Sequence, residues 1–366
     1  MTKNIEQVRN ARMYGLDMFR IALALLVFMF HAEIHIGCDF GLLNPFVSLG
    51  AIAMTGFYLL SGFVLYSSSK INPNSIIELV RFYKKRAIAI YPSYIFIGLL
   101  AVGWGIIGNP SGDNIIKQIV HLPILLMGIS TVFTSLFKFP PNDGLWFVSC
   151  LFFCYALYPW LYLLSSRMNS FWCCIVCGCS VFILLWSPLV VKVFDLASIY
   201  SNPFFRILEF LIGVILARLS EIISLNLSKK CWLILVLLAI GILIVGVSLL
   251  NVTGIVTANY MLCSWVALPC FGVLIILLAR DIKISKGVLY LSNLSYSFFL
   301  GQFFCFRMFR IINRTWPSIT DGNLAKIVIS FIICLIFACI VYHLIQTPAK
   351  VYLLHRIANS NFQDHD

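Results

Sequence analysis

Long apolar segments, each close to the length that crosses a lipid bilayer, recur along the whole chain between short polar stretches. Uninterrupted apolar runs of this length are typical of membrane helices, whereas β-barrel strands alternate apolar and polar residues. The pattern predicts an all-α polytopic membrane helical bundle with about ten transmembrane helices. We expect them near positions 16–34, 44–69, 88–108, 145–164, 171–191, 204–219, 231–250, 259–279, 287–306 and 325–346.

The composition excludes a soluble globular protein, because 61% of the residues are hydrophobic, only 11% are charged and the mean hydropathy is +0.97. The net charge of +12 does not indicate nucleic-acid binding, since the Lys and Arg of a membrane protein collect in its cytoplasmic loops. We expect no cleaved signal peptide, because polar residues 1–13 lead directly into a full-length span. The expected location is a bacterial inner (plasma) membrane.

The distribution of basic residues predicts the topology. With both termini in the cytoplasm, about 18 of the 26 Lys and Arg residues lie on the cytoplasmic side. Segment 115–137 is apolar enough to suggest an eleventh span, but counting it would place most of the later positive charge outside. Lys117, His121 and Pro123 also interrupt it. We therefore expect 115–137 to be a re-entrant or interfacial segment on the outer face.

The thirteen cysteines predict neither a metal site nor a disulfide framework. Cys173, Cys174, Cys177 and Cys179 crowd one span without any His or carboxylate, so helix packing explains them better than metal binding. We expect one membrane domain over 1–350 and a short cytoplasmic tail over 351–366. We expect no attached soluble catalytic domain, so any chemistry should take place inside the membrane domain.

The first predicted span, in YGLDMFRIALALLVFMFHAEIH, carries Arg20 near one end and His31 near the other. A helix would separate Arg20 and His31 by roughly 16 Å along its axis, about half of the hydrocarbon thickness. An ionisable group at that depth is costly and indicates a functional site, although an anchoring Arg and a packed His remain the alternative. Glu33 and His35 extend the outer end, where they either orient a substrate or lie at the interface.

Polar motifs on other spans are the remaining candidates. Ser61 and Gly62 are either functional or small residues for helix packing. A basic cluster, formed by Lys84, Lys85 and Arg86 and followed by Tyr91, lies at the cytoplasmic mouth of the third span, where it binds anions or only sets the topology. Arg206 and Glu209 lie one turn apart near the outer end of the sixth span, where they can pair.

The order of these motifs resembles the acyltransferase-3 family of integral membrane acyltransferases over nearly the whole chain, from Gly15 to Pro348. The matching features are LDMFR with His31, FYLLSGF, KRAIAIYP, Leu145-Trp146, Arg206 with Glu209, Phe210 and Gly213, the SYSFFL segment with Tyr296, and a polar-Pro signature after the last span. The resemblance implies transfer of acyl groups, most often acetyl, onto surface glycans, lipids or other acceptors.

Four positions depart from the family pattern. Ala89 replaces the last Arg of the basic motif, and Leu151 replaces a Glu that many members carry. Gln302 stands in place of a frequent His and Gln346 in place of a frequent Glu. With these acid–base groups missing, we expect catalysis to rest more heavily on His31 and Arg20.

The resemblance and the charges together predict an O-acyltransferase. Acetyl-CoA or another acyl-CoA is the expected co-substrate, because cytoplasmic Lys84, Lys85, Arg86 and Arg20 would attract its phosphates. A neutral His31 could act as general base or carry the acyl group itself. The expected acceptor is a carbohydrate hydroxyl of an O-antigen, another surface polysaccharide or a lipid-linked precursor. No bound cofactor or metal is expected, and no nucleic-acid partner.

Two other classes of protein fit parts of the pattern. A transporter or flippase of a lipid-linked glycan would explain many spans and buried charge, but its halves should be pseudo-symmetric, and no matching halves are visible. A glycan polymerase or ligase should carry a large charged outer loop. The longest outer loop, 109–144, holds few charges.

Overall fold

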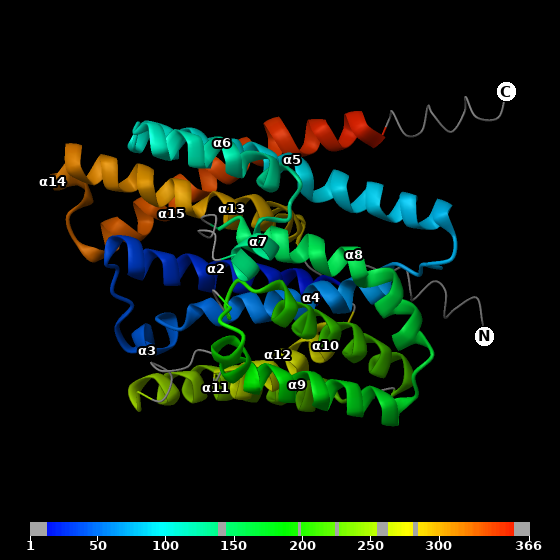
Figure 1. The fold of residues 1–366 in the computed structure, drawn as a ribbon. Helices are drawn as coiled ribbons and strands as arrows, with labels where there is room; N and C mark the ends of the chain where they lie inside the picture. The colour runs from blue at the N-terminus through cyan, green and yellow to red at the C-terminus, as the bar shows by residue number, and fades with distance from the viewer. Residues whose placement is uncertain are drawn as a thin grey trace.

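The computed structural model describes residues 13–137, 144–196, 199–223, 227–254, 263–280 and 285–354, and all regular structure within these ranges is helical. The longer helices lie side by side along one common direction (Figure 1). Their bounds are Tyr14–Ile36 (α2), Ala53–Ser68 (α4), Ile76–Gly108 (α5), Gly112–Leu126 (α6), Trp146–Ser166 (α8), Ser170–Val193 (α9), Pro203–Ile222 (α10), Lys229–Val252 (α11), Ser264–Leu278 (α12), Lys286–Thr315 (α13) and Asn323–Val341 (α15). The short helices are Asn44–Val47 (α3), Ser130–Phe137 (α7) and Pro317–Thr320 (α14), with single turns at Gly41–Leu43, Gly50–Ile52 and Tyr342–Gln346.

Seven helices of the described residues are long and apolar enough to cross a membrane, and α12 is a shorter apolar helix. The seven are Tyr14–Ile36, Gly50–Ser68, Ile76–Gly108, Trp146–Ser166, Ser170–Val193, Lys229–Val252 and Asn323–Leu354. Helices α10 and α13 are also long, but α10 carries several charges and α13 has polar residues throughout its apolar part. The chain is thus a multi-pass membrane protein, while the count of ten and the side of the termini stay predictions.

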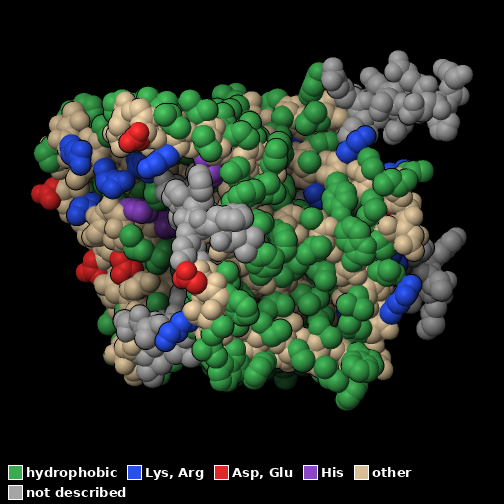
Figure 2. Space-filling view, in the orientation of Figure 1, with side chains coloured by type: hydrophobic (Ala, Val, Ile, Leu, Met, Phe, Trp, Pro, Cys, Tyr) green, Lys and Arg blue, Asp and Glu red, His purple; other side chains and the backbone are tan. Residues whose placement is uncertain are grey.

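The surface agrees with a bundle that crosses a bilayer. Hydrophobic side chains cover the middle of the visible face, and most of the charged ones lie toward the two ends of the helices (Figure 2). A bilayer requires this distribution, because its hydrocarbon core excludes charge.

Segment 115–137 lies in two helices, α6 and α7, separated at Gly128, which adopts a left-handed conformation with φ of 72°. Neither is among the helices long and apolar enough to cross a membrane, and the re-entrant or interfacial placement of 115–137 stays a prediction. The predicted third span begins too late: α5 starts at Ile76, where Ser75 caps it by accepting a hydrogen bond from the backbone N–H of Glu78. The basic cluster therefore lies on a helix and not in a loop.

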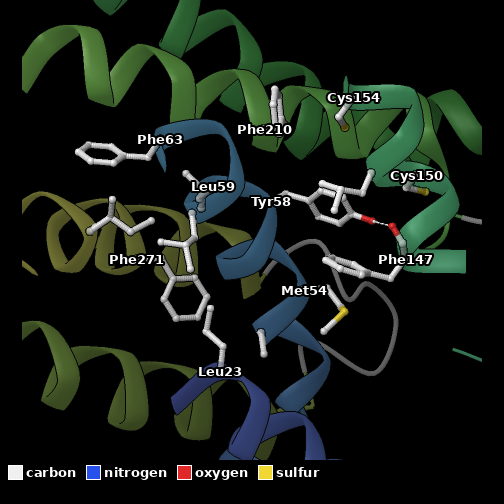
Figure 3. Close-up of a cluster of buried hydrophobic side chains, with 14 of the residues drawn as sticks. Leu23, Met54, Tyr58, Leu59, Phe63, Phe147, Cys150, Cys154, Phe210 and Phe271 are labelled. Carbon is white, nitrogen blue, oxygen red and sulfur yellow. Dashed lines mark hydrogen bonds between the residues drawn. The ribbon is translucent and has the colours of Figure 1, made fainter. Parts of the chain in front are cut away.

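Helix α4 lies at the centre of the bundle, and most of the apolar segment Gly50–Ser68 that contains it is buried. It approaches α10 so closely that a Cβ atom on Gly62 would lie 2.1 Å from the backbone oxygen of Phe210, and one on Gly213 would lie 2.0 Å from that of Leu59. Around this contact Tyr58, Phe63 and Phe271 extend from the helices into a shared apolar core, where the Tyr58 hydroxyl donates to the carbonyl of Phe147 at 3.1 Å (Figure 3).

Candidate functional site

His31 on α2 meets Gln302 on α13 inside the bundle, with 2.9 Å between its Nδ1 and the Gln302 Oε1. The Gln302 side chain is fully buried, and its Nε2 donates to the carbonyl of Ala24 at 3.5 Å. That second bond sets the orientation of the amide, so its oxygen faces the imidazole. Because an amide oxygen only accepts, Nδ1 is the donor in this bond, and in the neutral imidazole the lone pair then lies on Nε2.

Aromatic side chains contact the His31 ring. Its ring centroid lies 5.6 Å from that of His35 and 6.4 Å from that of Phe306. Glu33 faces another direction and accepts a hydrogen bond from the Ser48 hydroxyl at 2.8 Å. Gln302 is thus the side chain bound to His31 in the described part of the chain, and the sequence analysis had treated it only as a missing acid–base group.

Arg20 lies near the other end of α2 and is held by two neighbours. Its guanidinium is 3.4 Å from the carboxylate of Asp17 and donates to the hydroxyl of Ser292 at the same distance. Ser292 also donates to Asp17 at 2.6 Å, and Asp17 is only 5% exposed. The Asp of the LDMFR motif therefore orients Arg20, a role that the sequence analysis did not assign.

The basic cluster divides into exposed and half-buried members. Lys84 and Lys85 are exposed, whereas Arg86 lies against Phe82 and Tyr155, with its guanidinium carbon 5.6 and 5.8 Å from their ring centroids. Arg86 also donates to the hydroxyl of Ser69 at 3.1 Å. These contacts hold the guanidinium of Arg86 at the surface of the bundle, beside the exposed ammonium groups of Lys84 and Lys85.

Tyr155 on α8 lies beside one of the predicted donor residues. Its ring centroid is 5.8 Å from the guanidinium carbon of Arg86, which joins α8 to the basic cluster of α5. A tyrosine within an apolar run has no distinguishing pattern, so the sequence analysis did not find it.

Tyr91 and Gly62, which were predicted on the donor side, and Tyr296, which was predicted as a structural or acceptor-side residue, all make packing contacts. Tyr91 stacks among aromatic rings, 5.7 Å from Phe152. Tyr296 donates to the carbonyl of Ile90 at 3.0 Å and joins α13 to α5. Gly62 lies in the α4–α10 contact described above, and its part in donor binding stays a prediction.

Arg206 and Glu209 form a buried ion pair, with 2.7 and 2.8 Å between the Arg206 Nη1 and the two carboxylate oxygens. They are 1% and 0% exposed. Thr55 donates to Glu209 at 2.7 Å, and Arg206 donates from its Nε to the carbonyl of Tyr200 at 2.8 Å. The rings of Tyr58, Trp146 and Tyr200 surround the guanidinium. Trp146 therefore belongs to the shell of this pair.

Several helices are long and apolar enough to span a membrane, and buried polar side chains meet between them. This arrangement defines an integral membrane protein with a candidate site inside the membrane. Residues 13–343 match the family Acyl_transf_3, described as an acyltransferase domain, and the chain belongs to that family. It is therefore a membrane acyltransferase. No curated protein and no solved structure matches the chain significantly.

Proposed function

We propose that this protein is an O-acyltransferase that moves an acyl group, acetyl in the simplest case, from cytoplasmic acyl-CoA to a hydroxyl of a surface carbohydrate or its lipid-linked precursor. The observation that carries the proposal is the bond between His31 and Gln302. With Nδ1 donating to Gln302, a neutral imidazole carries its lone pair on Nε2, which is the form that a general base or a nucleophile requires.

The donor would bind at the end of the bundle that carries Arg86. A CoA molecule presents several phosphate oxygens, and guanidinium groups bind such oxygens in pairs. Arg86 is held in place by aromatic rings and Ser69, while exposed Lys84 and Lys85 can follow the ligand. Tyr155 packs against Arg86, and Arg20 lies on α2, the helix that also carries His31.

The proposed reaction moves the acyl group from the thioester sulfur of acyl-CoA to a hydroxyl oxygen of the acceptor. The acceptor hydroxyl attacks the thioester carbon while His31 Nε2 takes its proton, a C–O bond forms, the C–S bond breaks, and the CoA thiolate recovers the proton. In the alternative course, Nε2 attacks first, CoA leaves, and the hydroxyl then takes the acyl group from the imidazole. Both courses need the same tautomer of His31.

Mass spectrometry of surface glycans from cells with and without the gene tests the function. We expect the glycans of the deletion strain to lack the mass of one acyl group and to regain it when the gene is restored. Identical glycans in both strains would contradict the proposal. Loss of the whole glycan from the surface, with its precursor accumulating unchanged inside, would instead support a transporter.

A further inference from the structure

Three side chains hold the guanidinium of Arg86 in place. Phe82, one helical turn earlier on α5, and Tyr155 on α8 lie against it, and Ser69 accepts a hydrogen bond from its Nη2 at 3.1 Å. Its Nε atom is buried and has no hydrogen-bond partner in the described part of the chain. A guanidinium held by its neighbours offers its remaining N–H groups in a fixed direction, so the residues that hold those neighbours matter for donor binding.

Tyr158 on α8 holds the first of these supports, Ser69. Tyr158 is fully buried, and its hydroxyl donates to the carbonyl of Ser69 at 2.6 Å and to that of Leu65 at 3.0 Å. Leu65 lies in the last turn of α4, and Ser69 follows the helix with an extended backbone, φ −139° and ψ 98°. A carbonyl group just beyond a helix has no partner within it. Tyr158 provides that partner and so holds the backbone from which the Ser69 side chain extends.

The ring of Tyr158 holds the second support, Phe82. The two rings stack, with their centroids 5.4 Å apart and their planes at 30°. Phe82 is itself buried, so its position depends on the side chains packed against it. Tyr158 therefore contacts two of the three supports of Arg86, one with its hydroxyl and the other with its ring.

Nothing in the sequence distinguishes this tyrosine. Tyr158 lies in the apolar run YALYPW, outside every motif considered in the sequence analysis. Its contact with Ser69 joins positions 89 residues apart, so only the fold brings it to the basic cluster.

We propose that Tyr158 is a positioning residue for the donor: it holds Ser69 and Phe82 so that Arg86 faces the phosphate oxygens of acyl-CoA. This inference rests on the proposed function. A guanidinium that is already held loses less conformational freedom on binding an anion than a free side chain does. Tyr158 therefore lowers the KM for acyl-CoA, while the chemical step at His31 on α2 does not depend on it.

Tyr158→Phe tests the inference on the full-length protein in phosphatidylcholine nanodiscs, because it removes the hydroxyl and keeps the ring that stacks on Phe82. We expect the KM for acetyl-CoA to rise about 3- to 10-fold, the factor that corresponds to one ordinary hydrogen bond. The equilibrium dissociation constant of acetyl-CoA should rise equally, and kcat should stay close to that of the wild type. An unchanged KM, or a loss confined to kcat, would overturn the inference.

Tyr94→Phe is the matched control. Tyr94 is also fully buried, and its hydroxyl also donates to a backbone carbonyl, that of Leu125 at 2.9 Å. That bond joins α5 to α6 and involves none of the supports of Arg86, so the KM for acetyl-CoA should stay at the wild-type value. A rise as large as that in Tyr158→Phe would overturn the positioning role, since the loss of any buried hydroxyl would then weaken donor binding.

A double-mutant cycle separates positioning from a general structural role. Arg86→Ala keeps Lys84 and Lys85 for the phosphates, and in that background Tyr158→Phe should weaken acetyl-CoA binding no further, because the residue through which it acts is gone. Ser69→Ala removes the acceptor of the Arg86 bond, leaves Tyr158 intact and should also weaken acetyl-CoA binding. Additive losses in the cycle would overturn the inference. Normal binding by Ser69→Ala would do so too, even if Tyr158→Phe gave little folded protein.

Binding and transfer measured on the same samples keep this inference apart from the proposed function. Acyl transfer with a normal KM in Tyr158→Phe would refute the positioning role alone. Acetyl-CoA binding that depends on Tyr158, in a protein that transfers no acyl group to any acceptor, would refute the proposed function alone.

Discussion

At the scale of single residues, Gln302 changes the interpretation of the site most. Compared with the family pattern it is a lost histidine, and the sequence analysis took it as a missing acid–base group. In the structure its amide oxygen holds the Nδ1 proton of His31, and its amide nitrogen is bound to the carbonyl of Ala24. The glutamine thus positions the imidazole without exchanging a proton itself.

Replacing Gln302 with leucine should lower kcat about 10- to 100-fold, the loss typical of a residue that orients a reactive group. Acetyl-CoA affinity should stay normal, because Gln302 is remote from Arg86 in the structure. Steady-state acyl transfer and equilibrium donor binding measure the two effects. Gln346→Leu is the control, since that glutamine bonds to Ser297 and not to His31. Normal turnover in the Gln302 variant would show that the imidazole needs no such partner.

The Arg206–Glu209 pair is a residue-scale feature with a structural consequence. Neutralising either partner should destabilise the protein by about 3–5 kcal/mol, because each change leaves a buried charge without its counterion. The double variant Arg206→Met with Glu209→Leu should be less harmful than either single change. Thermal unfolding followed by size-exclusion chromatography in detergent measures this, and additive losses in the double variant would contradict the pairing.

At the scale of elements, the α4–α10 contact depends on two glycines that face each other's helix. The backbones meet because neither Gly62 nor Gly213 has a Cβ atom. Membrane helices commonly use small residues in this way, since van der Waals packing drives their association. The sequence analysis considered the SGF motif both for function and for packing. Gly62 packs against α10, and donor binding by Ser61 stays a prediction.

Gly62→Ala should therefore destabilise the bundle by about 1–3 kcal/mol or more, because the added methyl group would overlap a backbone oxygen that cannot move independently. The melting temperature of the purified protein is the measurement. Gly241→Ala on α11 is the control, as a Cβ atom there meets nothing within 4 Å. Equal melting temperatures for both variants would mean that α4 and α10 are not in close contact.

Hydrophobic pattern and charge predicted the elements better than their contacts. Apolar length predicted the helical class and the position of most helices, because the bilayer requires long apolar segments. Local pattern placed the start of α5 too late, since a Ser75 cap and a polar first half carry no hydrophobic signal. The pairing of His31 with Gln302 joins positions 271 residues apart, and no spacing rule applies at that distance.

At the scale of the whole molecule, the topology decides which substrate meets which end. The predicted orientation places Asn74 and Ser285 in the cytoplasm with the donor residues and places Asp321 outside. Single cysteines at these positions, in a protein without its native cysteines, should react accordingly: the first two only after the membrane is permeabilised, and the third from outside. The same orientation places position 226, which lies outside the described residues, in the cytoplasm, so a cysteine there should react like the first two. External labelling at position 74 or 285 would reverse the donor side.

The central claim is that His31 carries out the acyl transfer, and His31→Gln tests it most directly. Glutamine can form the hydrogen bond to Gln302 but can neither take a proton nor hold an acyl group. A general base contributes about 10²–10⁴ in rate, and a nucleophile often more. We predict that purified His31→Gln transfers no measurable radiolabelled acetyl group from acetyl-CoA, while its folded yield and acetyl-CoA affinity match the wild type. Transfer at close to the normal rate would make His31 a structural residue and would contradict the mechanism.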